Sequence, residues 1–141
     1  YDLLVFAVAL PFVRQTAKNA SPYIREGQRI VNVAKGIEND TLCTLRDVIL
    51  SEIPQADISV LSGPSHAEEV SKGVPTTVVV GAKTEKTAAF VQDVFMGSRF
   101  RVYTSPDIIG IELGGSLKNV IALAAGILDG MGLGDNTRAA L

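Results

Sequence analysis

Five short apolar segments, separated by more polar stretches, recur along the chain before Pro106. The first, from Leu3 to Ala9, is continuously apolar, which is typical of a strand covered on both faces in a parallel sheet. Similar patterns predict four further strands, at Arg29 to Ala34, Ile58 to Ser62, Thr76 to Val80 and Phe100 to Thr104. Because helical stretches alternate with these strands, we expect an α/β fold built on part of a doubly wound sheet.

The stretches between the strands carry the helical spacing of apolar residues. Pro11 opens the first of them, and Asn39-Asp40 is the expected N-cap of the second. The buried face of that second helix is predicted to hold Leu42, Leu45, Val48 and Ile49, with Cys43 as a small core residue beside them. A short helix is expected from His66 to Gly73 and a longer one from about Thr84 to Met96.

The composition changes at Asp107, where a long segment begins that is apolar around every side of a helix. Such a helix is predicted to be buried on all sides rather than on one face. We therefore expect a domain boundary near Pro106, with residues 1–106 in the sheet domain and residues 107–141 beginning an all-helical second domain. A last helix is expected after a glycine-containing turn, with Asn136 as its cap.

The apolar segment from Ile108 to Leu128 has the length of a membrane span. It contains Glu112, Lys118, Asn119 and four glycines, which are costly or weakening at the centre of a bilayer. We therefore expect a helix of a protein core and no membrane span.

Composition and charge narrow the possible functions. Apolar residues make up 47% of the 141 positions and charged residues 20%, which suits one folded core. The net charge is -2 and no cluster of Lys and Arg accompanies aromatic residues, so we expect no nucleic-acid partner. The single cysteine, Cys43, and the single histidine, His66, leave no Cys/His metal site. The chain starts without Met inside an apolar strand, and we expect it to be part of a longer protein.

Lys118 is the residue that most suggests chemistry. It lies in the middle of the apolar helix, where an ammonium is costly unless it has partners or a water-lined cavity. One interpretation is a lysine that extends its stem to reach solvent. The other is catalytic, because a desolvated lysine beside a second cation can exchange a proton near neutral pH, and Lys35 could be that cation. Gly114 and Gly115, one turn earlier, would permit a close approach by another group.

Three segments, VNVAKGIE, LSGPSHAEEV and GIELGGSLKNVIALAAGILDGMGLGDNTRAAL, resemble successive signatures of the NAD(P)-dependent glycerol-3-phosphate dehydrogenases. The resemblance covers essentially the whole chain. It implies the second half of a Rossmann-like domain followed by the start of a helical domain. It also implies a cytoplasmic, homo-oligomeric oxidoreductase that interconverts sn-glycerol 3-phosphate and dihydroxyacetone phosphate by hydride transfer with NAD or NADP.

The same resemblance implies roles for six residues. Lys118 would be the proton acceptor, and it would bind substrate together with Lys35, Gly63, Ser65 and Asn119. Lys35 and Ala67 would contact the cofactor. His66, in the same turn, is expected to have a packing or surface role rather than a catalytic one.

Two features limit these implications. The glycine-rich turn that usually anchors the cofactor pyrophosphate is absent from these 141 residues, and AVALPFVRQ departs from the family's usual proline position. In the family's sheet the strand from Leu3 to Ala9 lies beside the first strand of the nucleotide-binding half, which these 141 residues lack. Its edge should therefore be unpaired, and we expect this chain alone to associate and to be inactive. The alternatives are a 3-hydroxyacid dehydrogenase, whose Asn would replace Ala122, and a non-catalytic binding module.

Overall fold

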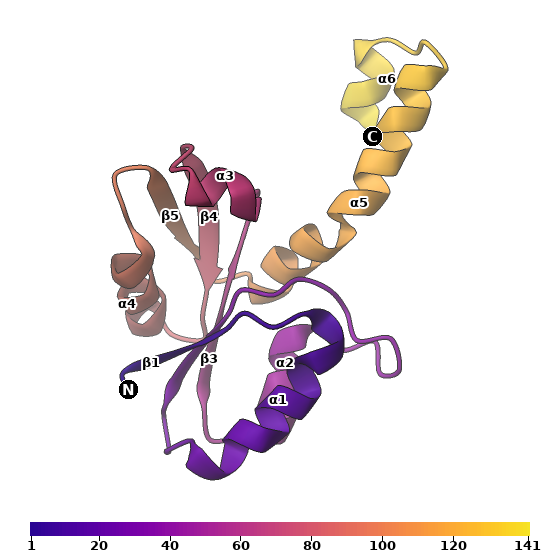
Figure 1. Ribbon diagram of the computed structural model, residues 1–141. Coiled ribbons are helices and arrows are strands. Elements are labelled where there is room, and N and C mark those ends of the chain that lie inside the picture. Colours follow the sequence, from indigo (N-terminus) through magenta and orange to yellow (C-terminus); the bar gives the residue numbers. More distant parts are fainter.

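A computed structural model describes residues 1–141 as a five-stranded sheet flanked by helices, with one long helix that projects from it (Figure 1). The strands are β1 (Leu3–Phe6), β2 (Arg29–Asn32), β3 (Asp57–Ser62), β4 (Thr76–Gly81) and β5 (Phe100–Ser105). Their order in the sheet follows the chain, and all neighbours are parallel except β3 and β4, which are antiparallel. The predicted α/β class is confirmed, in a mixed rather than a purely parallel sheet.

Helices connect the strands and continue the chain after the sheet. They are α1 (Val13–Ala20), α2 (Leu45–Glu52), α3 (Ala67–Ser71), α4 (Glu85–Phe95), α5 (Ile108–Gly130) and α6 (Asp135–Ala140). Two short 3-10 turns, Leu10–Phe12 and Ser21–Tyr23, flank α1. The helices α1 and α2 lie on one side of the sheet and α4 lies on the other (Figure 1).

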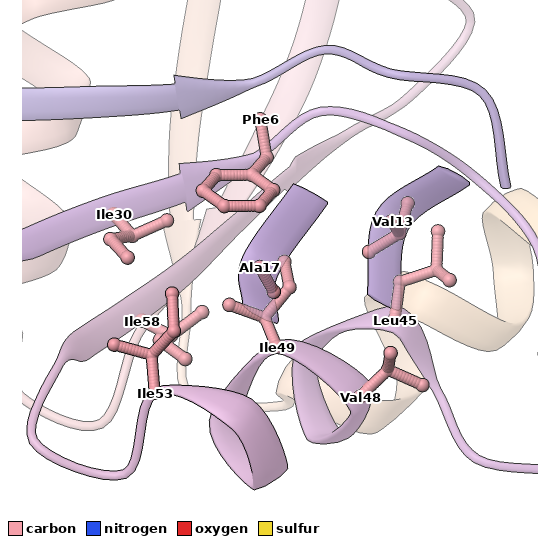
Figure 2. Packing of buried hydrophobic residues seen from close by; sticks show 9 residues of the cluster. All are labelled: Phe6, Val13, Ala17, Ile30, Leu45, Val48, Ile49, Ile53 and Ile58. Atoms are coloured by element: carbon pink, nitrogen blue, oxygen red, sulfur yellow. The ribbon is translucent and has the colours of Figure 1, made fainter. Parts of the chain in front are cut away.

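Each face of the sheet has its own apolar core. Figure 2 shows the first core, in which side chains from α1 and α2 meet those of the strands; its members are Phe6, Val13, Ala17, Ile30, Leu45, Val48, Ile49, Ile53 and Ile58. The second core includes Val31, Val78, Val91 and Val102 and is covered by α4. Neighbouring residues of β2 point to opposite faces, so Ile30 enters the first core and Val31 the second. This explains why Ile30 and Val31 are both fully buried although they are adjacent in the chain.

The end of β2 and the start of α2 differ from the sequence prediction. The strand ends at Asn32 because its side-chain amide bonds to both backbone groups of Ala34, donating at 3.0 Å and accepting at 3.2 Å. Asn39-Asp40 does not cap α2; instead Thr44 accepts from the amide of Asp47 at 3.4 Å.

The residues before Thr44 form a loop rather than a first helical turn. A backbone bridge between Ile37 and Thr44 closes that loop, and Leu42 has a φ of 57°. Leu42 is 78% exposed and does not belong to the buried helical face that was predicted. Cys43 packs at the edge of the first core, as a small core residue would, but it lies half-buried in the loop before the helix. Their spacing matched a helix, but the threonine cap and the bridge begin the helix later.

The long helix α5 also differs from the prediction. It was expected to be buried on all sides, but Glu112 is its only buried residue and Leu123 is 68% exposed. The first part packs against β3 and β4, whereas the second part projects beside α6 (Figure 1). Apart from α6 near its end, no element of this chain covers that second part, so most of its apolar side chains are exposed. The cap of α6 is Gly134 rather than Asn136.

By length and composition, α5 could also cross a membrane. This is weak evidence for a span, because the core helix of a soluble protein passes the same test. At the opposite end of the fold, β1 is an edge strand, as predicted, and Val5 on it is 49% exposed.

Candidate functional site

The carboxyl ends of β2 and β3 and the first turns of α5 surround a pocket of about 260 Å³. It is lined by Lys35, Ser62, Gly63, Pro64, Val79, Gly110, Ile111, Gly114, Gly115 and Lys118. The turns after parallel strands are where ligands bind in open α/β sheets. Three residues singled out from the sequence, Lys35, Gly63 and Lys118, therefore lie around one space although they come from distant parts of the chain.

Lys35 lines this pocket and contacts polar groups on its rim. Its Nζ donates to the Oγ of Ser65 at 3.2 Å, and the Ser65 hydroxyl is 3.3 Å from the carbonyl oxygen of Gly63. Burial lowers the pKa of the Lys35 ammonium, and the nearby charge of Lys118 lowers it further. The sequence led us to expect that Lys35 would lower the pKa of Lys118, whereas in the structure it is the pKa of Lys35 that burial and Lys118 lower. Two ammonium groups that repel one another in one pocket favour an anionic ligand between them.

Close backbone approach explains two of the glycines. A Cβ on Gly63 would lie 2.9 Å from the carbonyl oxygen of Thr77 and from the Cα of Val78, so a side chain there would collide with β4. A Cβ on Gly115 would lie 2.5 Å from the Ser62 Oγ. Gly115 therefore lets α5 approach the end of β3, as the sequence suggested, whereas Gly114 faces open space.

Two residues that sequence reasoning left without a role join α5 to the sheet domain. The Glu112 Oε1 accepts from the backbone amide of Arg46 at 2.9 Å, and burial raises the pKa of this carboxyl. The Ser116 Oγ accepts from the amide of Gly36 at 3.1 Å and donates to the Glu112 carbonyl oxygen at 2.7 Å. The sequence feature that pointed to Lys118, a charged residue inside an apolar helix, is also present at Glu112 and could have identified it.

The remaining predicted residues lie outside the small pocket. Ser65 and Ala67 border a larger, mostly apolar cavity of about 720 Å³ between α3, the end of α4 and the sheet. Of the two cavities, only the smaller one is lined by both lysines. Asn119 is exposed and lines neither cavity, and His66 is exposed at the start of α3. The structure gathers no group of three or more metal-binding side chains.

Comparisons with known proteins identify the family. Residues 1–88 match the model of the NAD-dependent glycerol-3-phosphate dehydrogenase N-terminus, and residues 107–141 match that of the C-terminus. The glycerol-3-phosphate dehydrogenase [NAD(P)+] of Agathobacter rectalis is 65% identical over 140 residues, and that of Fusobacterium nucleatum is 56% identical over 142. Each alignment covers 99% of this chain and 42% of the relative, so the chain spans less than half the length of these relatives.

Solved structures agree with the sequence matches. The glycerol-3-phosphate dehydrogenase of Coxiella burnetii has a TM-score of 0.79 at 37% identity, covering 98% of this chain and 42% of its own. That of Saccharomyces cerevisiae has a TM-score of 0.87 at 26% identity, covering 99% and 42%. With the fold, both family models and close relatives in agreement, the chain belongs to the NAD-dependent glycerol-3-phosphate dehydrogenase family.

Proposed function

We propose that this chain supplies the substrate-binding and proton-transfer residues of an enzyme that interconverts sn-glycerol 3-phosphate and dihydroxyacetone phosphate with NAD or NADP. The observation that carries the proposal is the placement of Lys35 and Lys118 around one pocket at the ends of β2 and β3. Both lysines lie in signatures of the family to which the chain belongs. A phosphorylated triol is an anion, which suits the positive charge of that pocket.

Each residue of the proposed site has a part in the reaction, including Ser65 and Asn119, which lie outside the small pocket. Lys118 takes the proton of the C2 hydroxyl during oxidation and returns it during reduction. Lys35 holds positive charge near the reacting oxygen or the phosphate, and it lines the same pocket as Lys118. Gly63 and Ser65 offer backbone and hydroxyl hydrogen bonds from their turn, and Asn119, next to Lys118, orients the substrate oxygens.

The cofactor site is shared between this chain and segments that its relatives possess. When bound, the nicotinamide accepts or gives the hydride. The apolar cavity beside Ala67 is of the size and character that take flat ligands, and Lys35 reaches its rim through Ser65. We therefore assign Ala67 and Lys35 to the cofactor contact. The glycine-rich pyrophosphate turn is absent from these 141 residues, so this chain alone should bind NAD(H) weakly.

The alternative functions are not favoured. The close relatives carry the glycerol-3-phosphate dehydrogenase name, and neither a 3-hydroxyacid dehydrogenase nor a non-catalytic module is among them. We further propose a homo-oligomeric enzyme, on the family resemblance alone. A cytoplasmic location is part of the proposal, and the free thiol of Cys43 suits that reducing compartment.

A chimera tests the proposal. Residues 1–141 replace the matching segment of the Agathobacter rectalis relative, which yields a chain of family length. The chimera should oxidise sn-glycerol 3-phosphate with NAD or NADP and should leave 3-hydroxybutyrate untouched, with the unaltered relative as the positive control. A folded chimera that is inactive on sn-glycerol 3-phosphate, or that prefers the hydroxyacid, would contradict the proposed function.

A further inference from the structure

The segment between β2 and α2 is held at both of its ends by one face of α5. At its start, the amide of Gly36 donates to Ser116 at 3.1 Å. At its end, the amide of Arg46, in the first turn of α2, donates to the Glu112 carboxylate at 2.9 Å. Glu112 and Ser116 are four residues apart and therefore share a face of the helix. Lys35 directly precedes Gly36, so the contact between Gly36 and Ser116 holds the backbone next to Lys35 against α5.

Burial of the Glu112 side chain costs folding free energy that its one hydrogen bond does not offset, so stability alone does not explain this contact. Its side chain is only 8% exposed, and its second oxygen, Oε2, has no hydrogen-bond partner. The guanidinium of Arg46 does not pair with it either: its Nη1 lies against Asp47 and its Nε is buried without a partner. A buried carboxylate with one oxygen unsatisfied loses hydration that a single hydrogen bond does not replace. An apolar residue at this position would avoid that penalty but would leave the Arg46 amide without its acceptor.

Together with the packing of its first turns against β3 and β4, three contacts fix the position of α5 relative to the sheet. They are the acceptor of Glu112 on the first turn of α2, the hydroxyl of Ser116 on Gly36, and the close approach of Gly115 to Ser62. The carboxylate also complements the positive end of the α2 dipole. All three lie within the two turns that precede Lys118, while the second half of α5 projects away from the sheet (Figure 1).

We propose that Glu112 is a positioning residue, which sets the separation of Lys118 and Lys35 by anchoring α5 to the first turn of α2. This inference rests on the proposed function for its effect on turnover, but not for its effect on the two lysines themselves. Because α5 is a continuous helix, a small tilt at Glu112 moves Lys118 as a rigid body relative to Lys35. Displacements of about 1 Å in a catalytic group can lower turnover by about a hundredfold.

Glu112→Leu and Glu112→Gln separate position from charge in the chimera. Leucine removes the acceptor, so kcat should fall about tenfold to a hundredfold while KM for sn-glycerol 3-phosphate changes less than threefold. Glutamine keeps an oxygen that accepts from the Arg46 amide, so it should retain kcat within about threefold. Thr84→Ala is the matched control, because Thr84 caps the first turn of α4 and lies outside the lysine pocket. It should lower thermal stability but leave kcat unchanged.

A second measurement does not depend on catalysis. The pKa of Lys35, followed by NMR of labelled lysine, is lowered by burial and by Lys118, so E112L should raise it toward the ordinary value, whereas E112Q and T84A should not. If the unaltered chimera is inactive while E112L still shifts Lys35, the proposed function fails and the positioning role stands.

Other outcomes overturn the inference. One is a folded E112L with normal kcat and an unchanged pKa of Lys35. The other is an equal loss of kcat in E112L and T84A. Should E112L not fold, Ser116→Ala replaces it, since it removes the Gly36 contact without burying a new group. S116A should then lower kcat about threefold to tenfold. A folded S116A with normal kcat and unchanged Lys35 titration would contradict the anchoring role of this face.

Discussion

The sheet domain and α5 bury their apolar side chains to very different degrees. Between β1 and β5, alternating strand residues fill two cores, and the largest of them are fully buried. In α5, which is richer in apolar residues than the sheet part, most side chains beyond Ser116 are nevertheless exposed. The difference shows that apolar composition predicts burial only where another element is present to pack against. Stability is thus concentrated in the sheet, while the proposed catalytic lysine is on the helix that is attached by few contacts.

Ile49→Ala should strongly destabilise the sheet part of the molecule. Ile49 on α2 is 0% exposed and lies in the middle of the first core, so its truncation leaves a cavity. A loss of about 2–5 kcal/mol in the free energy of unfolding is expected. Denaturant titration of the 141-residue chain measures it. A loss below about 1 kcal/mol would mean that the core is less tightly packed than its burial indicates.

Lys118→Ala tests α5, where we expect a loss of turnover without a loss of stability. Lys118 is exposed and supports no core, so unfolding should hardly change. In the chimera, kcat should fall about a hundredfold or more, the usual contribution of a positioned proton acceptor. Lys35→Ala is the companion variant and should chiefly raise KM for substrate, because it removes a binding charge. Steady-state kinetics of both variants decide the roles, and near-normal turnover in K118A would remove Lys118 from the mechanism.

A third prediction concerns the loop that follows Lys35. Arg14 on α1 bonds to Glu38 at 2.6 Å and to Glu52 at 2.6 Å, and it holds the pKa of Glu38 at about 2. Since this lies below the ordinary value of 4.5, the ion pair contributes fully above pH 4.5 and its contribution disappears as the pH falls toward 2.

Glu38→Gln should therefore lower Tm at pH 6, and the difference from the unaltered chain should shrink as the pH falls from 4.5 to 2. Glu26→Gln, at an exposed carboxylate, is the control and should show no such convergence. Thermal scans across this pH range provide the measurement. A constant difference between E38Q and the unaltered chain would show that the ion pair does not contribute.

Leu123→Ala should have the smallest effect in the 141-residue chain. Leu123 is 68% exposed on the outer half of α5, so its truncation should change the free energy of unfolding by no more than about 0.5 kcal/mol. In the chimera the same change should cost about 2 kcal/mol or more, if the remaining length of the relative covers this half. Equal effects in both chains would show that the outer half of α5 stays uncovered.

Periodicity and turn residues predicted the five strands and most helices from the sequence. They failed where local contacts overrode spacing, since Leu42 has helical spacing but sits at positive φ in a loop that the Ile37–Thr44 bridge closes. For the site, the family signatures and the rule on strand ends singled out Lys35, Gly63 and Lys118, which surround one pocket. Glu112 has the same signal as Lys118, a charge inside an apolar helix, but its partner is a backbone amide 66 positions away, and no sequence pattern encodes that contact.

The alternation along β2 has a consequence for how the sheet domain unfolds. Ile30 and Val31 are adjacent in the chain, are both fully buried, and belong to different cores. A one-residue slip of β2 against β1 or β3 would therefore reverse both faces at once and empty both cores. Any opening that displaces β2 must likewise disturb both cores. The two halves of the sheet should accordingly form one cooperative unit, in which the amides of β2 exchange with solvent only through global opening.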